Sequence, residues 1–378
     1  MKIVVLGGGR VGSAIARDLA KDSRFEVTVA DASEAALGRF ADEPRLRGLR
    51  ADLSDPSEIG RAVEDQDLVV GAVPGFMGFA TVRTVLEHGK DIVDISFFDD
   101  DPFKLDALAR ERGRIALVDC GVAPGSSNLI LGHAVATFDR IESFVCYVGG
   151  LPAVRTWPFE YKSVFSPIDV IEEYTRPARF VRNGQRVTMP ALTETEPVDF
   201  AGVGTLEAFN TDGLRTLLAL DIPSMVEKTL RYPGHVEKMR MLRETGFFSQ
   251  EPIEAGGVQV RPLDLTARLL FSAWLLGPEE EDFTVLRVFV EGEKGGRRER
   301  RTWDLLDRYD RETRTTSMAR TTGYTCTAMV RLLAAGLYTR KGISPPEHVG
   351  RDAACYEFVL RELAARNVRF QETVTELD

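Results

Sequence analysis

The sequence predicts an α/β domain with a parallel sheet, interrupted by an inserted α+β domain whose sheet is mostly antiparallel or mixed. Three observations support this fold class. Residues 1–124 alternate short apolar runs with helical patterns, which is typical of βαβ units. After Pro124-Gly125, β-type segments follow one another without regular helices between them. The chain then becomes helical again, and we expect these last helices to return to the first domain.

The first domain, at residues 1–124, is expected to contain a five-stranded parallel sheet. Residues 2–6 form a continuous apolar run, and residues 11–20 follow with apolar side chains at helical spacing. The remaining strands are expected at 26–30, 67–73, 91–96 and 115–119.

The inserted domain, at residues 125–313, is marked by two turn signals. Asn183-Gly184 stands between β-like flanks, and Gly295-Gly296 joins two further β-like runs, so both predict hairpins. A helix is expected at 127–138. The C-terminal part, at 314–378, has helical patterns at 317–335 and 353–365.

Composition and charge argue against several classes of function. The 378 residues carry 48 Lys and Arg against 58 Asp and Glu, so the net charge of −10 disfavours nucleic acid and anionic membranes as partners. The longest run without polar side chains, 68–80, is too short to span a bilayer. Because the first strand starts at the N-terminus and leaves no room for a signal peptide, we expect a cytoplasmic protein. Four cysteines without a CxxC and four histidines without an HExxH predict free thiols and no metal.

A glycine fingerprint follows the first strand. Gly7, Gly9 and Gly12 fit GxGxxG between a strand and a helix, where the glycines allow a tight turn, a close approach of pyrophosphate and helix–strand packing. The pattern predicts a dinucleotide-binding domain of the Rossmann type. S-adenosylmethionine is the rival ligand, since its enzymes also use a glycine-rich first loop and an acid after the second strand.

Asp31 ends the second expected strand, where a carboxylate accepts hydrogen bonds from the ribose hydroxyls of NAD. The 2′-phosphate of NADP would be repelled there by about 4 kcal/mol at about 4 Å and an effective dielectric near 20. No arginine follows directly in Ala32-Ser33. We therefore predict NAD, with Arg10 over the adenine or pyrophosphate.

The residues of the remaining cofactor site are taken from the ends of the strands, because ligands of open α/β sheets bind outside the carboxyl ends. Val73, Pro74 and Phe76 are expected to flank the nicotinamide, although Phe76 could equally be plain core. The predicted cofactor set is completed by Val11, Asp52, Leu53, Ser96 and Cys120.

Several longer motifs resemble the saccharopine dehydrogenase superfamily, and within it most closely the lysine 6-dehydrogenases. They are Ala72-Val73-Pro74-Gly75-Phe76, Asp94-Ile95-Ser96-Phe97, Tyr161-Lys162, Phe165-Ser166-Pro167, and residues 119–125, 147–152, 174–178, 207–215 and 229–235. The resemblance covers essentially the whole chain. It implies a Rossmann domain, a substrate domain with a mixed sheet, a C-terminal return and a homo-oligomer, with a dimer favoured.

Two departures separate this chain from the saccharopine reductases that it resembles. Those enzymes carry Asp where this chain has Ala123 and Cys where it has Val148, and they typically use NADP. The resemblance therefore implies oxidation of the ε-amine of L-lysine, or of a close analogue, to 2-aminoadipate 6-semialdehyde and ammonia, followed by cyclisation to piperideine-6-carboxylate. The alternatives are a saccharopine or carboxynorspermidine reductase and, outside the enzymes, an NAD(H)-binding redox sensor.

A substrate carboxylate calls for a bidentate arginine, and Arg176, Arg215 and Arg231 are the candidates. Asn210, Thr211 and Asp212 precede Arg215. Asn210 or Thr211 is expected to cap a helix running to Leu220, to bind substrate, or to do both.

Four residues are candidates for catalysis. Asp94 could act as a base or simply cap the turn that follows its strand. Tyr161 and Lys162 could tune proton transfer, and a solvated lysine is the plainer interpretation. His235 is expected to begin a helix through Leu242 and could either change protonation near neutral pH or serve a structural role.

Overall fold

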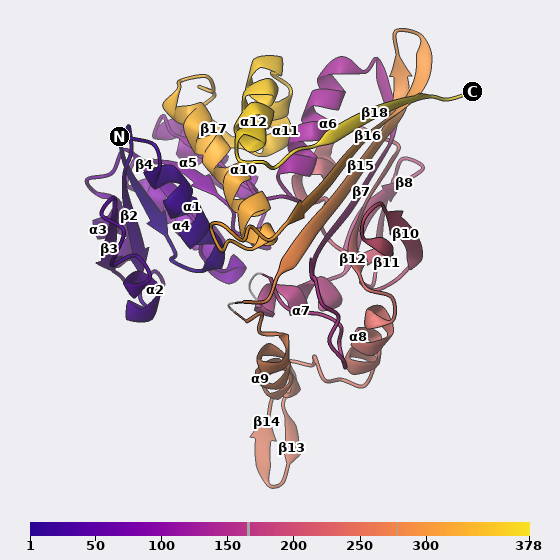
Figure 1. Ribbon diagram of the computed structural model, residues 1–378, viewed down its shortest axis with the longest axis horizontal. Helices are drawn as coiled ribbons and strands as arrows, with labels where there is room; N and C mark the ends of the chain where they lie inside the picture. The colour runs from indigo at the N-terminus through magenta and orange to yellow at the C-terminus, as the bar shows by residue number, and fades with distance from the viewer. Residues whose placement is uncertain (165–166, 278) are drawn as a thin grey trace. The chain divides into compact units, whose positions relative to one another are not determined.

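A computed structural model describes residues 1–164, 167–277 and 279–378, so the Phe165-Ser166 part of one quoted motif lies outside the described residues. The chain forms two compact units (Figure 1). The first consists of residues 1–137 and 319–369, and the second of 138–318 and 370–378. In the described part of the chain, no helix is long and apolar enough to cross a membrane.

These bounds differ from the expected ones at three places, the shortest of which is residues 314–318, which belong to the second unit. The helix α6 (Ser126–Thr137) belongs to the first unit, where Asn128 Nδ2 donates to Glu347 Oε2 at 3.0 Å. Close packing explains this placement, since a Cβ on Gly132 would lie 2.2 Å from the Glu347 carbonyl oxygen. At the C-terminus, residues up to 369 belong to the first unit, but β18 (Gln371–Glu376) pairs with a strand of the second.

The first unit contains a seven-stranded parallel sheet in the order β17-β6-β5-β4-β1-β2-β3. The five predicted strands are confirmed as β1 (Lys2–Leu6), β2 (Glu26–Asp31), β4 (Leu68–Gly71), β5 (Asp91–Asp94) and β6 (Ile115–Leu117). Two strands escaped prediction. β3 (Leu46–Arg50) is exposed at four of its five residues and lacks an apolar run, and β17 (Gly342–Ser344) has only three residues.

The helices of this unit follow the strands as βαβ crossovers demand. They are α1 (Arg10–Ala20), α2 (Glu34–Gly38), α3 (Pro56–Val63), α4 (Gly75–Glu87), α5 (Asp106–Glu111), α6, α10 (Ser317–Ala334), α11 (Pro346–Gly350) and α12 (Ala353–Ala365), with a 3₁₀ turn at Pro102–Leu105. Apolar side chains of the central strands, such as Val4, Val69 and Ile92, form the core with residues of α3 and α4.

The second unit is built on a nine-stranded mixed sheet. Its main path runs β10-β11-β12-β7-β15-β16-β18, with β8 and β9 attached to β12. The strands are β7 (Arg140–Pro152), β8 (Ala178–Arg182), β9 (Gln185–Met189), β10 (Glu196–Phe200), β11 (Gly204–Asn210), β12 (Ser224–Arg231), β15 (Asp282–Lys294), β16 (Arg297–Arg308) and β18. The sheet is mixed because β12 runs parallel to β7, while the other neighbours along the main path are antiparallel.

Both predicted hairpins are confirmed. Asn183 and Gly184 have φ of 50° and 76°, the left-handed values that a two-residue hairpin turn requires, between β8 and β9. Lys294 pairs with Arg297 across Gly295-Gly296, which joins the long strands β15 and β16 (Figure 1).

The helices of the second unit are α7 (Pro167–Thr175), α8 (His235–Glu244) and α9 (Pro262–Trp274), and a separate small hairpin is formed by β13 (Ile253–Ala255) and β14 (Val258–Val260). One predicted helix is wrong. Asn210 is the last residue of β11, and the segment after it forms only a 3₁₀ turn at Arg215–Ala219, preceded by Leu214. Neither Asn210 nor Thr211 caps a helix there.

Candidate functional site

The glycine loop between β1 and α1 has the geometry of a dinucleotide cradle. Gly7 has φ of 111°, and a Cβ on it would lie 2.4 Å from the Ala72 carbonyl oxygen. A Cβ on Gly12 would lie 2.0 Å from the Gly7 carbonyl oxygen, so helix and loop are in contact there. At Gly9, by contrast, no atom comes within 4 Å of that position. The first and third glycines are thus needed for packing, and the second leaves open the space that a pyrophosphate occupies.

The Asp31 carboxylate is fixed beside this loop. Gly8 N–H donates to its Oδ2 at 2.7 Å, and Ser33 N–H donates to its Oδ1 at 2.8 Å. Two backbone donors orient the carboxylate. Asp31 is half-buried, so the group remains accessible from the carboxyl edge of the sheet. The residues present therefore fit a dinucleotide.

Most other predicted cofactor residues lie at the same edge. Arg10 and Val11 form the first turn of α1, and Val73 and Pro74 connect β4 to α4. Phe76 is 76% exposed, so its interpretation as plain core is wrong. Three further residues of the predicted set, Cys120, Asp52 and Leu53, are described by their burial or by contacts within their own turn. Burial raises the pKa of the Cys120 thiol well above its usual range, and Asp52 holds its own turn by accepting from Ser54 Oγ at 2.6 Å, next to buried Leu53.

Asp94 is fully buried at the end of β5. Its Oδ1 accepts from Ser96 N–H at 2.8 Å, and its Oδ2 accepts from Ser96 Oγ at 3.1 Å. A Cβ on Gly71 would lie 1.9 Å from Oδ2, so a glycine on the neighbouring strand makes room for the carboxylate. Asp94 therefore caps the turn after its strand, as one of the two interpretations expected. Its role as a base stays a prediction.

Three predicted residues of the second unit meet in a buried aromatic cluster. The Arg231 guanidinium lies 4.5 Å from the ring centroid of Tyr161, donates to Tyr174 Oη at 3.2 Å, and pairs with Glu173 Oε2 at 2.6 Å. His235 Nε2 lies 3.0 Å from the same Tyr174 hydroxyl. Arg231 is only 2% exposed, so its charge is balanced inside the fold, and it is not a free clamp for a substrate carboxylate.

The ionisation of this cluster argues against proton transfer by its members. Burial, together with the nearby Arg231, lowers the pKa of His235 to about 3, so His235 does not change protonation near neutral pH. Its Nδ1 lies 2.9 Å from the Phe159 carbonyl oxygen, which fixes the ring in place. Burial also raises the pKa of Tyr161 well above its usual range. His235 begins α8 as predicted, and its burial and fixed ring favour the structural one of its two expected roles.

Other predicted polar residues have partners within the second unit. Arg179 binds the Asp212 carboxylate through Nε at 2.8 Å and Nη2 at 2.7 Å. Arg176 pairs with Glu172 at 2.5 Å, one turn back on α7. Lys162 Nζ lies 3.8 Å from Glu280 Oε2 and donates to the Leu275 carbonyl oxygen at 3.3 Å, and its role in proton transfer stays a prediction.

The segment from Asn210 to Arg215 lies over one face of β12. Side chains alternate along a strand, so Glu227, Thr229 and Arg231 share that face, and all three are buried. Thr211 Oγ1 is 2.9 Å from Thr229 Oγ1. A Cβ on Gly213 would lie 1.6 Å from Glu227 Oε1, so only a glycine fits above this carboxylate. Arg215 follows with φ of 48°, in the left-handed region that non-glycine residues rarely adopt.

Sequence reasoning gave no role to the acids and tyrosines that complete these clusters. Tyr174 is the first residue of the quoted motif 174–178 and Glu173 directly precedes it, while Lys228, between two quoted motifs, donates to Glu196 Oε1 at 2.6 Å. Tyr147 donates to the same Glu196 oxygen at 3.1 Å. Three charged residues, Glu227, Lys228 and Arg231, inside an otherwise β-type segment were the signal that could have revealed a buried polar face.

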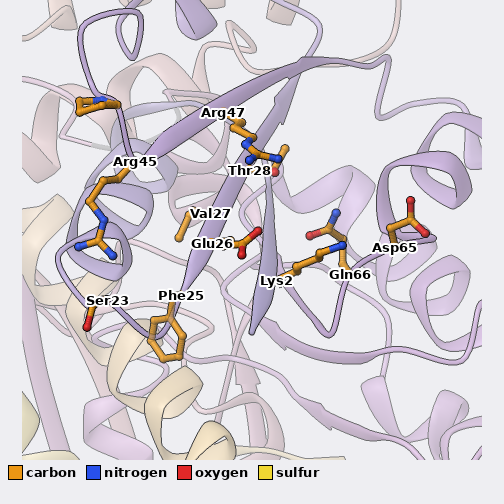
Figure 2. A pocket seen from close by; sticks show the side chains of 11 residues that line it. Lys2, Ser23, Phe25, Glu26, Val27, Thr28, Arg45, Arg47, Asp65 and Gln66 are labelled. Atoms are coloured by element: carbon orange, nitrogen blue, oxygen red, sulfur yellow. The ribbon is translucent and has the colours of Figure 1, made fainter.

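A pocket of about 500 Å³ lies at the opposite edge of the first unit's sheet (Figure 2). Lys2, Glu26 and Arg47, which line it, stand at the amino ends of β1, β2 and β3. Because dinucleotides bind beyond the carboxyl ends of parallel strands, this pocket is not the cofactor site.

Comparisons with known proteins agree with the fold and with the glycine loop. The saccharopine dehydrogenase NADP binding domain matches residues 3–117, and the saccharopine dehydrogenase C-terminal domain matches residues 121–368. Saccharopine dehydrogenase [NADP(+), L-glutamate-forming] of Schizosaccharomyces pombe is 24% identical over an alignment of 458 positions that covers 99% of each chain. The mitochondrial alpha-aminoadipic semialdehyde synthase of Mus musculus is 24% identical over 277 residues, and this match spans 69% of the chain but only 30% of the mouse protein.

A solved structure shows the same fold. Apo saccharopine dehydrogenase (L-Glu forming) from Saccharomyces cerevisiae superposes with a TM-score of 0.81 over 99% of both chains, at 19% identity. The family models together match nearly the whole chain, and the superposition covers 99% of it. The protein therefore belongs to the saccharopine dehydrogenase family, and its first unit is a Rossmann domain for a nicotinamide dinucleotide.

Proposed function

We propose that the protein is an NAD-dependent oxidoreductase that oxidatively deaminates the ε-amine of L-lysine. The products are 2-aminoadipate 6-semialdehyde, which cyclises to piperideine-6-carboxylate, and ammonia. Bound NAD would accept the hydride from the ε-carbon. The reaction consumes one water, which adds to the oxidised carbon before ammonia leaves.

The observation that carries this proposal is the Asp31 carboxylate. Backbone N–H groups of Gly8 and Ser33 hold both of its oxygens beside the glycine loop. In that position a carboxylate accepts hydrogen bonds from both ribose hydroxyls and opposes a 2′-phosphate. The curated relatives above include an enzyme named for NADP. The preference for NAD is thus a proposed departure of this chain from that relative.

The substrate half of the proposal is supported by charge. Saccharopine carries three carboxylates, and lysine carries one. In the second unit, Arg176, Arg179 and Arg231 each form an ion pair with an acid of the same unit. Ala123 and Val148 stand where the saccharopine reductases that the chain resembles carry Asp and Cys. A substrate with a single carboxylate needs fewer cationic side chains to bind it than saccharopine does.

The chain's own residues would act by binding and positioning. Arg215 is the predicted partner of the α-carboxylate, because a guanidinium can bind a carboxylate through two parallel hydrogen bonds. Asp94, at the carboxyl end of β5, is the predicted acceptor of the proton from water. The ε-amine must be neutral to react, and exclusion of water lowers the pKa of an ammonium group.

A second candidate, oxidation of saccharopine, is favoured by the match to the Schizosaccharomyces pombe enzyme over 99% of both chains. One assay separates the candidates. The protein is mixed with NAD or NADP and with lysine, ornithine or saccharopine, and reduced cofactor is followed at 340 nm. We expect turnover with lysine and NAD. Turnover with saccharopine and none with lysine would refute the proposal, and cofactor binding without turnover on any amine would favour a redox sensor.

A further inference from the structure

Three charged residues stand together where the adenosine end of the dinucleotide would bind. Asp31 ends β2, Arg50 ends β3, and the two are register partners in the parallel ladder. Neighbouring strands lie about 4.8 Å apart, and facing residues project on the same side of the sheet. Glu34 opens α2, directly after the turn that follows Asp31. An acid, a base and a second acid therefore share this corner of the first unit.

Arg50 is held by Glu34. Arg50 Nη1 donates to Glu34 Oε1 at 2.7 Å, while the Asp31 oxygens accept from the Gly8 and Ser33 backbone. The side chains of Arg50 and Glu34 are 70% and 77% exposed. An ion pair this exposed contributes little to folding, so stability does not explain why the arginine is engaged here.

We propose that Glu34 is a cofactor-selectivity residue, which keeps Arg50 from serving as a binding group for a 2′-phosphate. A ribose 2′-phosphate carries between one and two negative charges and is best bound by an arginine near the end of the second strand. Arg50 is such a cation. Glu34 neutralises it and adds its own charge to that of Asp31. This inference rests on the proposed preference for NAD and names the residues that enforce it.

The test measures cofactor binding, independent of any substrate. Dissociation constants for NAD and NADP are measured by isothermal titration calorimetry for the wild type and for Glu34→Gln. Once Arg50 is released, we expect NADP to bind about three- to tenfold more tightly, the size of one exposed ion pair. The Kd for NAD should stay within about twofold, because NAD has no 2′-phosphate for Arg50 to bind.

Two further variants identify the cause. In Glu34→Gln/Arg50→Gln the gain for NADP should disappear, because the released cation is gone. Glu87→Gln is the matched control: Glu87 lies 4.0 Å from Arg83 at the last turn of α4 and is half exposed. That turn is about 18 Å along the helix from the nucleotide edge, so this variant should bind both cofactors like the wild type.

The outcomes are distinct. An unchanged NADP affinity in Glu34→Gln, an equal gain for NAD, or a gain that persists without Arg50 would each overturn the inference. The wild-type ratio of the two dissociation constants tests the proposed NAD preference separately. If the wild type binds NADP more tightly, that preference fails, and the change on Glu34→Gln still decides whether Glu34 withholds Arg50.

Discussion

Replacement of Asp31 by alanine tests the cofactor site most directly. The variant removes the group expected to accept two charge-assisted hydrogen bonds from the ribose, each contributing about 1.5–3 kcal/mol. It also leaves the Gly8 and Ser33 N–H groups without the carboxylate, at a site where water can replace it because Asp31 is half-buried. We expect a net loss of about 3 kcal/mol, which is about a hundredfold in the Kd for NAD.

NADP should respond differently, because the same change removes the repulsion of its 2′-phosphate. Calorimetric titration with both cofactors should therefore show the Kd ratio moving toward NADP by at least about a hundredfold. Asp31→Asn is the control for shape, since its amide oxygen can still accept one backbone N–H but carries no charge. Equal losses for NAD and NADP in Asp31→Ala would refute the reasoning, because they would show that the carboxylate does not distinguish the ribose from its phosphate.

Four further predictions concern the loop and the second unit. Gly9→Ala should fold normally yet bind NAD at least about tenfold more weakly, since its methyl group meets no protein atom but enters the pyrophosphate space. Gly12→Ala should instead lower Tm, because its Cβ would lie 2.0 Å from the Gly7 oxygen. Glu173→Gln should reduce the free energy of unfolding by about 3–5 kcal/mol in urea titrations, and Glu173→Gln/Arg231→Met by less, because the second change removes the unpaired buried charge. The pKa of His235 is about 3 in the folded state against about 6.5 in the unfolded state, so the unfolded state binds the proton first and stability falls as pH drops. Between pH 7 and pH 5 the free energy of unfolding of the wild type should therefore fall by about 2 kcal/mol more than that of His235→Phe. Arg215→Ala should raise the KM for lysine at least about tenfold with a smaller effect on kcat, and an unchanged KM would remove Arg215 from the substrate site.

The parallel sheet and the glycine loop could be predicted because they depend on local signals. An apolar run followed by GxGxxG fixes a strand, a turn and a helix within residues 2–20, and each glycine has the role that its position predicts. The β3 strand could not be found in this way. Its sequence, Leu-Arg-Gly-Leu-Arg, is polar and exposed, and it becomes a strand only because β2 offers it an edge.

The residues of the second unit were predicted less well, because their roles depend on partners distant in sequence. Nothing near Arg231 shows that Glu173 neutralises it across 58 residues, or that Tyr174 and Tyr161 enclose it. Likewise, His235 is chemically suited to titrate near neutral pH, and only burial against these rings shows that it does not. A residue type predicts a chemical capacity, whereas burial and pairing decide whether that capacity is used.

The polar face of β12 connects these observations. Glu227, Thr229 and Arg231 are buried on one face of an interior strand of the sheet, where polar groups are costly unless they are paired. Glu227 fits only because residue 213 is glycine, and Thr229 contacts Thr211, so this face determines the path of the segment that carries Asp212 and Arg215. Arg215 then adopts a left-handed φ of 48°, which costs free energy and persists only where surrounding contacts impose it. The strand therefore acts as a template for the predicted substrate residues. Substitutions that alter its polar face should change the KM for the amine through the conformation of residues 211–215.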